Sequence, residues 1–389
     1  MALQNSNTYS NWAHQISLLS SRIISKQGLC ERMGKPAVKL ALSLLEKQVK
    51  QAYQTVRSKD LFAQFKRVLI QDSTTLNLPK ELANQFPGNK AKGRQRAVAR
   101  IQSVYDLIHN RFCFFGLHSY VENDQSAAMQ LIHYLKAGDL LIRDLGYFTL
   151  ISIENIIKRH AYFLSRLPHN VSIFDLQSKE KLDILKLLKG REFFDGWVFI
   201  GNETHLKVRL VVVRTPEQIA RERRRRARNH ADKRFTYSSR YLKLLDYTFY
   251  ITNVDVKTWE YPQVHTAYRI RWKVEIIFKS WKSYFHIDKL IHKQCCNYNR
   301  VQCTIFLMLL FITLFQLKLY HRFEMRIKKK YQRQISLLKL AKMVSQNILF
   351  ILSKSICILD KYLLQNCCYE CRSDRSNINQ LSLISSKLT

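Results

Sequence analysis

The chain has 389 residues, of which 47% are hydrophobic and 12% aromatic, so it is long and apolar enough for two or three folded domains and is not intrinsically disordered. Lysine and arginine number 64 against 29 aspartates and glutamates, and the resulting formal charge of +35 favours a polyanionic partner, nucleic acid first and an anionic membrane surface second. With only 10 glycines and 6 prolines, linker-rich and collagen-like architectures are disfavoured.

Residues 1–62 are predicted to be helical. Apolar residues recur at helical spacing in HQISLLSSRIISKQGL and in AVKLALSLLEKQVKQAY, and basic residues occupy the other faces. The pattern fits a helical DNA-binding module or a solvated helical cap, and the sign of the charge favours the first.

Residues 63–145 are predicted to form strand, strand, strand, helix and strand, in that order. The strands are KRVLIQDSTTLNLP, RAVARIQSVYDLI, RFCFFGLHSYV and AGDLLIRDLGYF, and a turn is expected at His109–Asn110. The helix is expected over Asp124–Lys136 because of its acidic start and apolar spacing. An antiparallel meander followed by a crossover to a further strand is the opening of a ribonuclease-H-like fold.

Residues 160–257 are predicted to be mostly β, from five apolar runs: YFLSRL, VSIFDL, GWVFIGN, HLKVRLVVVRT and YTFYITNVD. Between the last two lies the basic run RERRRRARNHADKR, Arg221–Arg234. Such runs are typical of a solvated, mobile segment. On this basic background we interpret the run as one that follows DNA phosphates without reading sequence, through Arg223, Arg224, Arg225 and Arg226.

One long helix is predicted over residues 263–295 and further helices over 300–366, followed by a frayed Ser/Asn-rich tail. Val301–Leu317 carries no charge over 17 residues, the lower limit for a membrane span. We interpret it as a buried core helix, with a membrane anchor as the alternative. A second basic cluster follows it, made of Arg326, Lys328, Lys329, Lys330 and Arg333.

The nine cysteines are odd in number and irregularly spaced, which indicates reduced thiols rather than a disulfide framework. Cys367, Cys368 and Cys371 could supply three of four zinc ligands, but no fourth ligand is evident. Scattered thiols are therefore the favoured interpretation.

The segment YRIRWKVEIIFKSWK is the most informative part of the chain. Its Tyr268, Arg271, Glu275 and Lys282 are offset by 3, 4 and 7 residues, so on a continuous helix they would form one polar stripe. The simplest interpretation of that stripe alone is an ion pair between Arg271 and Glu275, with Lys282 exposed to solvent.

Two aspartates alter that interpretation. Asp72 and Asp144 are each predicted to end an apolar strand, where a carboxylate points into a cleft. Two such acids on neighbouring strands repel each other unless a divalent cation bridges them. With Glu275 they would form an oxygen-rich site suited to Mg²⁺, in which two ions about 3.5–4 Å apart can promote phosphodiester cleavage. Taken singly, each aspartate could instead be a turn-forming residue, and Asp139 is given no ligand role.

These motifs resemble those of DDE transposases of the insertion-sequence-4 type, over residues 26–320. The matching pieces are VLIQDSTTLNLP, GDLLIRDLGYF, YITNVD and the signature Y-x2-R-x3-E-x6-K, which fits at every named position. The resemblance implies an α/β fold: a ribonuclease-H-like catalytic core with a mostly β insertion, flanked by helical terminal regions. It implies five parts: 1–62, DNA-binding; 63–159, first part of the core; 160–257, insertion; 258–300, completion of the core; 301–389, helical region for dimerisation.

The resemblance also implies a chemistry. Asp72, Asp144 and Glu275 would be the catalytic ligands of two Mg²⁺ ions, for which Mn²⁺ could substitute, and Tyr268, Arg271 and Lys282 would contact DNA phosphates. The enzyme would nick the ends of a bacterial insertion element, free a 3′-OH and join it to target DNA. Its partners would be the terminal inverted repeats, target DNA and a second protomer, in the cytoplasm at the nucleoid and without a membrane.

Three alternatives follow from these observations: a metal-dependent transposase, a catalytically inert DNA-binding protein of the same fold, and a membrane-associated basic protein. The acidic triad favours the first.

The resemblance also implies an aromatic residue of the insertion that holds a flipped DNA base, as it does in relatives. The candidates here are Trp197, Trp259, Tyr247 and Phe249, each of which could equally be a core residue.

Overall fold

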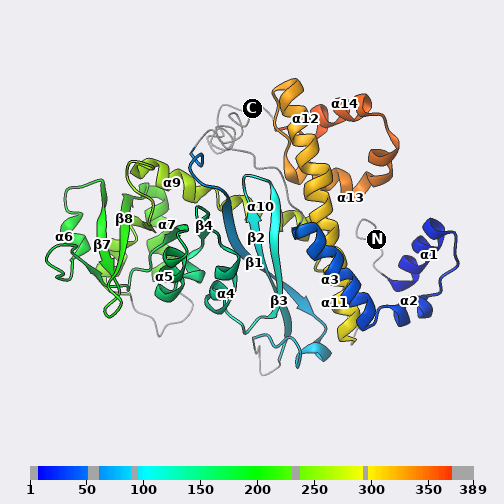
Figure 1. The fold of residues 1–389 in the computed structure, drawn as a ribbon, viewed down its shortest axis with the longest axis horizontal. Coiled ribbons are helices and arrows are strands. Elements are labelled where there is room, and N and C mark those ends of the chain that lie inside the picture. The colour runs from blue at the N-terminus through cyan, green and yellow to red at the C-terminus, as the bar shows by residue number, and fades with distance from the viewer. Residues whose placement is uncertain (1–7, 51–60, 90–94, 230–236, 292–296, 370–389) are drawn as a thin grey trace. The chain divides into compact units, whose positions relative to one another are not determined.

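The computed structural model describes residues 8–50, 61–89, 95–229, 237–291 and 297–369 (Figure 1). The chain divides into two compact units. The first unit contains residues 1–60, 72–123 and 272–389, and the second contains residues 61–71 and 124–271. The chain passes from one unit to the other within the strand that contains Asp72.

The first unit begins with three helices, as predicted: α1 (Tyr9–Ser20), α2 (Lys26–Arg32) and α3 (Lys35–Lys50). The side chains of Thr8 and Ser25 accept backbone hydrogen bonds from Asn11 and Gly28, so α1 and α2 begin at ordinary N-caps. Residues 51–60 and the predicted tail after 372 lie outside the described residues.

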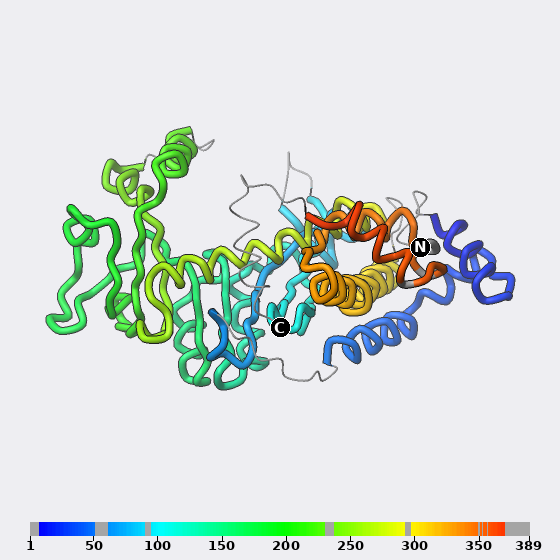
Figure 2. The backbone as a smooth tube through the Cα atoms, turned by 90° about the horizontal axis from the view of Figure 1, so that it is seen from above, coloured from blue at the N-terminus to red at the C-terminus, as the bar shows by residue number. Residues whose placement is uncertain are grey.

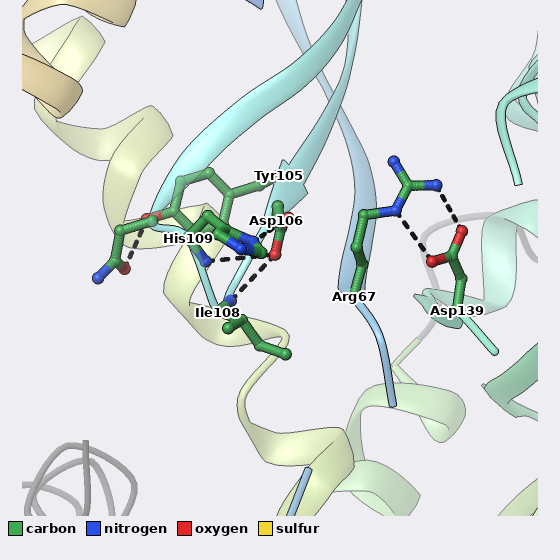
Figure 3. Close-up of polar contacts among 7 residues, drawn as sticks. Arg67, Tyr105, Asp106, Ile108, His109 and Asp139 are labelled. Carbon is green, nitrogen blue, oxygen red and sulfur yellow. Dashed lines mark hydrogen bonds and ion pairs between the residues drawn. The ribbon is translucent and has the colours of Figure 1, made fainter. Parts of the chain in front are cut away.

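The strands of the first unit follow the order β3-β2-β1. These strands are β1 (Val68–Leu78), β2 (Ala97–Asp106) and β3 (Arg111–Ser119). Only the part of β1 from Asp72 onward belongs to the first unit. A short 3₁₀ turn, η1 (Lys80–Leu82), follows β1. The predicted turn at His109–Asn110 is confirmed, with Asn110 at φ 50°. The Asp106 carboxylate accepts hydrogen bonds from the backbone N–H groups of Ile108 and His109 and lies 2.7 Å from Nδ1 of His109 (Figure 3).

The helices that follow in the first unit are α10 (Trp272–Ser283), α11 (Tyr298–Leu314), α12 (His321–Tyr331), α13 (Leu337–Ser353) and α14 (Ile356–Asn366), with a π-helical turn η4 (Phe315–Tyr320) joining α11 to α12. Figures 1 and 2 show α12, α13 and α14 packed side by side. Within α12, Arg326 and Lys330 pair with Asp360 of α14 at 2.7 and 3.4 Å, so part of the second basic cluster has an intramolecular partner.

The uncharged run 301–317 is a packed helix, as predicted. It packs against α3 (Figure 1), and its buried residues include Val301, Ile305, Leu309 and Ile312. The continuous helix Tyr298–Tyr331 is long and apolar enough to cross a membrane by length and composition, but 67% of its most apolar window is buried inside the protein. A buried helix accounts for the run without a membrane.

The strands of the second unit follow the order β1-β4-β5-β9-β8-β7-β6. The first part of β1, β4 (Leu140–Arg143) and β5 (Tyr162–Arg166) are parallel, and the others pair antiparallel. Those others are β6 (Ile173–Phe174), β7 (Phe193–Ile200), β8 (Leu206–Arg214) and β9 (Tyr247–Thr252). All five runs predicted to be β between 160 and 257 therefore contain a strand, and β5 continues the parallel part of the sheet.

The helices of the second unit connect these strands. The predicted helix at Asp124 is shorter than expected, because α4 (Asp124–Gln130) passes into a 3₁₀ turn η2 (Leu131–Tyr134). The second unit also contains the 3₁₀ turn η3 (Leu145–Tyr147), α5 (Leu150–Lys158), α6 (Ile184–Leu187), α7 (Glu217–Arg228), α8 (Ser239–Leu244) and α9 (Tyr261–Arg269). Helix α5 connects the parallel strands β4 and β5, as a crossover must.

An aromatic cluster of Phe62, Phe65, Tyr162 and Trp259 stabilises the second unit. Trp259 is 1% exposed, and its Nε1 donates to the Leu61 carbonyl at 2.7 Å. This candidate for a flipped base is thus a core residue in the structure. Asp139, to which no ligand role was given, forms a two-bond ion pair with Arg67 (Figure 3).

Candidate active site

Asp144 lies where it was predicted, directly after the buried strand β4. It occupies the N-cap position of the turn η3, but its side chain makes no capping hydrogen bond there. Instead, its Oδ1 accepts a hydrogen bond of 3.1 Å from the hydroxyl of Tyr268 and lies 3.9 Å from Nε of Arg271. The Asp144 side chain is 44% exposed, so the carboxylate is anchored on one side and accessible to solvent.

Tyr268 and Arg271 are not on the long helix that was predicted. Helix α9 ends at Arg269, α10 begins at Trp272, and Ile270 and Arg271 form a turn with i→i−3 hydrogen bonds to Ala267 and Tyr268. The single polar stripe is therefore wrong. The turn sends Tyr268 and Arg271 to Asp144 in the second unit, while Glu275 and Lys282 belong to the first.

The environment of Tyr268 keeps its hydroxyl protonated. Burial, and then the negative charge of Asp144, raise the pKa of Tyr268 well above its usual value. The ring packs against Tyr250 at 5.2 Å and lies 5.9 Å from the guanidinium of Arg271, which is itself only 7% exposed. Tyr268 thus acts as a fixed hydrogen-bond donor to Asp144.

Asp72 was predicted to end its strand, and this is wrong. Strand β1 continues to Leu78, and from Ser73 to Asn77 buried positions alternate with more exposed ones. What ends at Gln71 is the pairing with β4, whose last matched residues are Gln71 and Arg143. The half-buried carboxylate of Asp72 accepts a hydrogen bond from the backbone N–H of Ser73 at 2.8 Å, which limits the directions in which it can point.

Glu275 lies in the first turn of α10 and Lys282 in its last turn. Both positions are electrostatically favourable, because a helix dipole stabilises an acid near its N-terminus and a base near its C-terminus. The two residues lie two helical turns apart on one side of α10, whose buried side contains Val274, Phe278 and Trp281. Glu275 is half-buried and Lys282 is exposed.

A buried polar cluster anchors α10 in the first unit, and the sequence analysis missed it. Lys273 Nζ donates to Oδ1 of Asn110 at 2.7 Å, and Nδ2 of Asn110 donates to Oε2 of Glu324 at 3.2 Å. The hydroxyls of Tyr105 and Tyr320 donate to Asn110 and Glu324, both at 3.0 Å. Burial lowers the pKa of Lys273 and raises the pKa of both tyrosines. The cluster ties the first turn of α10, two residues before Glu275, to the β2–β3 turn and to α12.

The described part of the arginine run lies in helix α7 through Arg228, and its remainder, residues 230–234, lies outside the described residues. Arg223 donates to the hydroxyls of Thr215 and Thr248, each at 3.1 Å. Arg224 pairs with Glu217 and Asp246.

The side chains of Arg225 and Arg226 are 66% and 77% exposed, and both pair with Glu222 on the helix surface. Surface pairs of this kind contribute little free energy and can be exchanged for a phosphate contact.

The three candidate acids come from both units: Asp72 and Glu275 from the first, Asp144 from the second. Within the described residues, no three His, Cys, Asp or Glu side chains gather into a metal-binding group.

The thiols of Cys367 and Cys368 are buried, and Cys367 Sγ lies 3.5 Å from Sδ of Met343, whereas Cys371 falls outside the described residues.

Comparison with known proteins identifies the family. The family model described as Transposase DDE domain matches residues 63–314, a span that includes all three acids and the whole signature segment. The chain belongs to the DDE transposase family. The assignment to the insertion-sequence-4 type within it remains a prediction.

Curated relatives agree along most of the transposase. It is 30% identical over 365 residues to the transposase for insertion sequence element IS231F of Bacillus thuringiensis subsp. israelensis, with 88% of this chain and 75% of the relative covered. It is 29% identical over 322 residues to the transposase for insertion sequence element IS1151 of Clostridium perfringens, with 75% and 67% covered. A piggyBac transposase in a synaptic complex with hairpin DNA, solved by cryo-electron microscopy, aligns with a TM-score of 0.46 at 8% identity over 97% of this chain and 75% of that chain. Because the matching family model and the curated relatives are transposases, this chain is an enzyme of DNA transposition, and a catalytically inert binding protein is not favoured.

Proposed function

We propose that this transposase cuts DNA at the ends of its insertion element and joins the freed 3′-OH to target DNA, with Asp72, Asp144 and Glu275 as its metal ligands. The observation that carries the proposal is the register of two parallel strands. Gln71 of β1 pairs with Arg143 of β4, and the next residue in each strand is one of the two aspartates. The chain thus brings both aspartates to the end of the same strand pairing.

The donor set suits a hard divalent cation. Three carboxylates supply oxygen ligands, which Mg²⁺ prefers, and Mn²⁺ accepts the same ligands. When bound, two such ions lower the pKa of an attacking water and stabilise the leaving oxygen. The protein's own part is to hold the ligands: Tyr268 orients Asp144 through its hydroxyl, and the N-terminal turn of α10 presents Glu275.

The basic residues around these acids would hold the DNA backbone. Arg271 has the geometry to fork onto a phosphate, and the exposed Lys282 can act as a point charge. Of the arginine run, we assign phosphate contacts to the exposed Arg225 and Arg226, while Arg223 and Arg224 support the sheet through their internal hydrogen bonds.

The finer organisation is also a proposal. A meander of β1, β2 and β3, the crossover through α4 and the parallel strands β4 and β5 support a ribonuclease-H-like core, with the insertion beginning after β5. Residues 1–62 would bind the inverted repeats, and 301–389 would pair two protomers on DNA. The site of action would be the cytoplasm, at the nucleoid.

An experiment with DNA that carries the element's inverted repeats tests this function. The purified transposase is expected to nick the ends and to form joined products with Mg²⁺ or Mn²⁺, and to bind the ends without cleaving them in EDTA. Cleavage that persists in EDTA, or no cleavage of repeat DNA with either metal, would contradict the proposal.

In the same assay, end affinity should fall steeply with salt, and Arg225→Ala/Arg226→Ala should reduce the slope of log Kd against log salt by about 2. An unchanged slope would remove these arginines from the interface.

A further inference from the structure

Arg143 is a buried arginine next to Asp144. It is 4% exposed, and its guanidinium donates to three acceptors that carry no formal charge. Nε donates to Oε1 of Gln71 at 2.7 Å, Nη2 donates to the Ala128 carbonyl at 2.7 Å, and Nη1 donates to Oγ of Ser152. One side chain therefore connects β4 with β1, with α4 and with α5.

The strand pairing that Arg143 completes is otherwise uniform. The preceding pairs are Val68 with Leu140, Leu69 with Leu141 and Ile70 with Ile142. All six side chains are aliphatic and at most 2% exposed. A shift of two residues would keep every side chain on its own face and would exchange one aliphatic contact for another. Hydrophobic packing alone is thus a weak determinant of this register.

The pair of Gln71 with Arg143 distinguishes the observed register from the shifted ones. In a shifted register the guanidinium would lose the Gln71 acceptor and remain buried, which costs far more than a misplaced methyl group. Burial already lowers the pKa of Arg143 to about 9, which reflects how closely the charge is enclosed.

We propose that Arg143 is a positioning residue of the transposase site. With Gln71 it fixes the register of β1 against β4, and this register sets the positions of Asp72 and Asp144, the next residue in each strand's sequence. The proposal rests on the proposed function, because it takes these two aspartates as metal ligands. It gives the buried arginine a role that its neutral hydrogen-bond partners do not by themselves explain. Arg143 touches neither DNA nor metal in this role.

The test compares Arg143→Met with Arg209→Met. Arg209 is a matched control because it is 1% exposed, belongs to the same unit and bonds to Asp195 and the Val254 carbonyl. The measurements are Mn²⁺ affinity by calorimetry without DNA, end binding in EDTA, and melting temperature. Arg143→Met is expected to weaken Mn²⁺ binding by about 10–100-fold, the usual effect of residues that orient metal ligands. Arg209→Met should lower the melting temperature while leaving Mn²⁺ affinity unchanged.

The double variant Gln71→Leu/Arg143→Met keeps the test decisive if Arg143→Met folds poorly. An apolar pair removes the buried Gln71 amide that Arg143→Met leaves without its arginine partner, so the melting temperature should recover in part, but Mn²⁺ affinity should stay low because the register is no longer specified. Recovery of both, or equal loss of affinity in Arg209→Met, would overturn the positioning role. Asp144→Asn separates the two proposals: if it binds Mn²⁺ like the wild type, the ligand assignment fails, whatever Arg143 does.

Discussion

Replacement of Glu275 by glutamine is expected to reduce end cleavage by at least about 10³-fold, a loss typical of removing an electrostatic contribution to the transition state. Glutamine preserves the shape of the side chain and leaves α10 in place. It removes the negative charge that a divalent cation requires of its ligand. End binding in EDTA should stay within about twofold of the wild type, because phosphate contacts rather than Glu275 provide that affinity.

Glu260→Gln is the matched control for this substitution. Glu260 is also a glutamate at a helix N-terminus, where it forms a capping box with Gln263 at the start of α9. Glutamine can still accept the capping hydrogen bond, so cleavage by this variant should be unchanged. A Glu275→Gln enzyme that cleaves with Mg²⁺ at the wild-type rate would show that Glu275 is not a ligand.

Replacement of Lys273 by methionine is expected to lower the free energy of unfolding by about 1–3 kcal/mol, the range for leaving a buried polar group without its hydrogen-bond partner. Glu324 is 8% exposed and receives hydrogen bonds from Asn110 and Tyr320, while Lys273 reaches it through Asn110. Without Lys273 the carboxylate of Glu324 remains in the interior with no nearby ammonium to offset its charge. Urea unfolding followed by far-UV circular dichroism measures the change.

A double-mutant cycle distinguishes this mechanism from simple loss of packing. Glu324→Gln removes the unpaired charge, so Lys273→Met/Glu324→Gln should be clearly more stable than the sum of the two single effects requires. Strictly additive effects would mean that Lys273 and Glu324 are not coupled through Asn110. Because Lys273 lies two residues before Glu275, the single variant should also lose cleavage activity in proportion to its loss of folded protein.

The strands could be predicted because each contains an apolar or alternating run, and the position of Asp144 follows from the end of the short apolar run at β4. The break between α9 and α10 could not be predicted, because residues 269–272 contain no glycine or proline. The break consists only of two i→i−3 hydrogen bonds in place of the i→i−4 bonds of an α-helix. The position of Asp72 was misjudged because β1 changes its pairing at Gln71 while the strand itself continues to Leu78. Hydrophobic periodicity indicates the conformation of one segment but not the strand with which that segment pairs.

The contacts that hold the site in place were beyond the reach of sequence patterns for a related reason. Arg143 meets Gln71 from 72 residues away, and Asn110 meets Glu324 from 214 residues away. Composition likewise identified the arginine run but could not show that Arg223 bonds to two threonines while Arg225 is exposed. Charge alone does not separate an arginine that supports a sheet from one that is available to DNA.

Asp72, Asp144 and Glu275 are proposed to hold the same metal. Crystals of the transposase bound to element-end DNA and grown with Mn²⁺ test it most directly, through the anomalous scattering of manganese. The strongest anomalous peak is expected at bonding distance from carboxylate oxygens of all three residues. A peak that any one of the three carboxylates cannot reach, in a complex competent for cleavage, would contradict it.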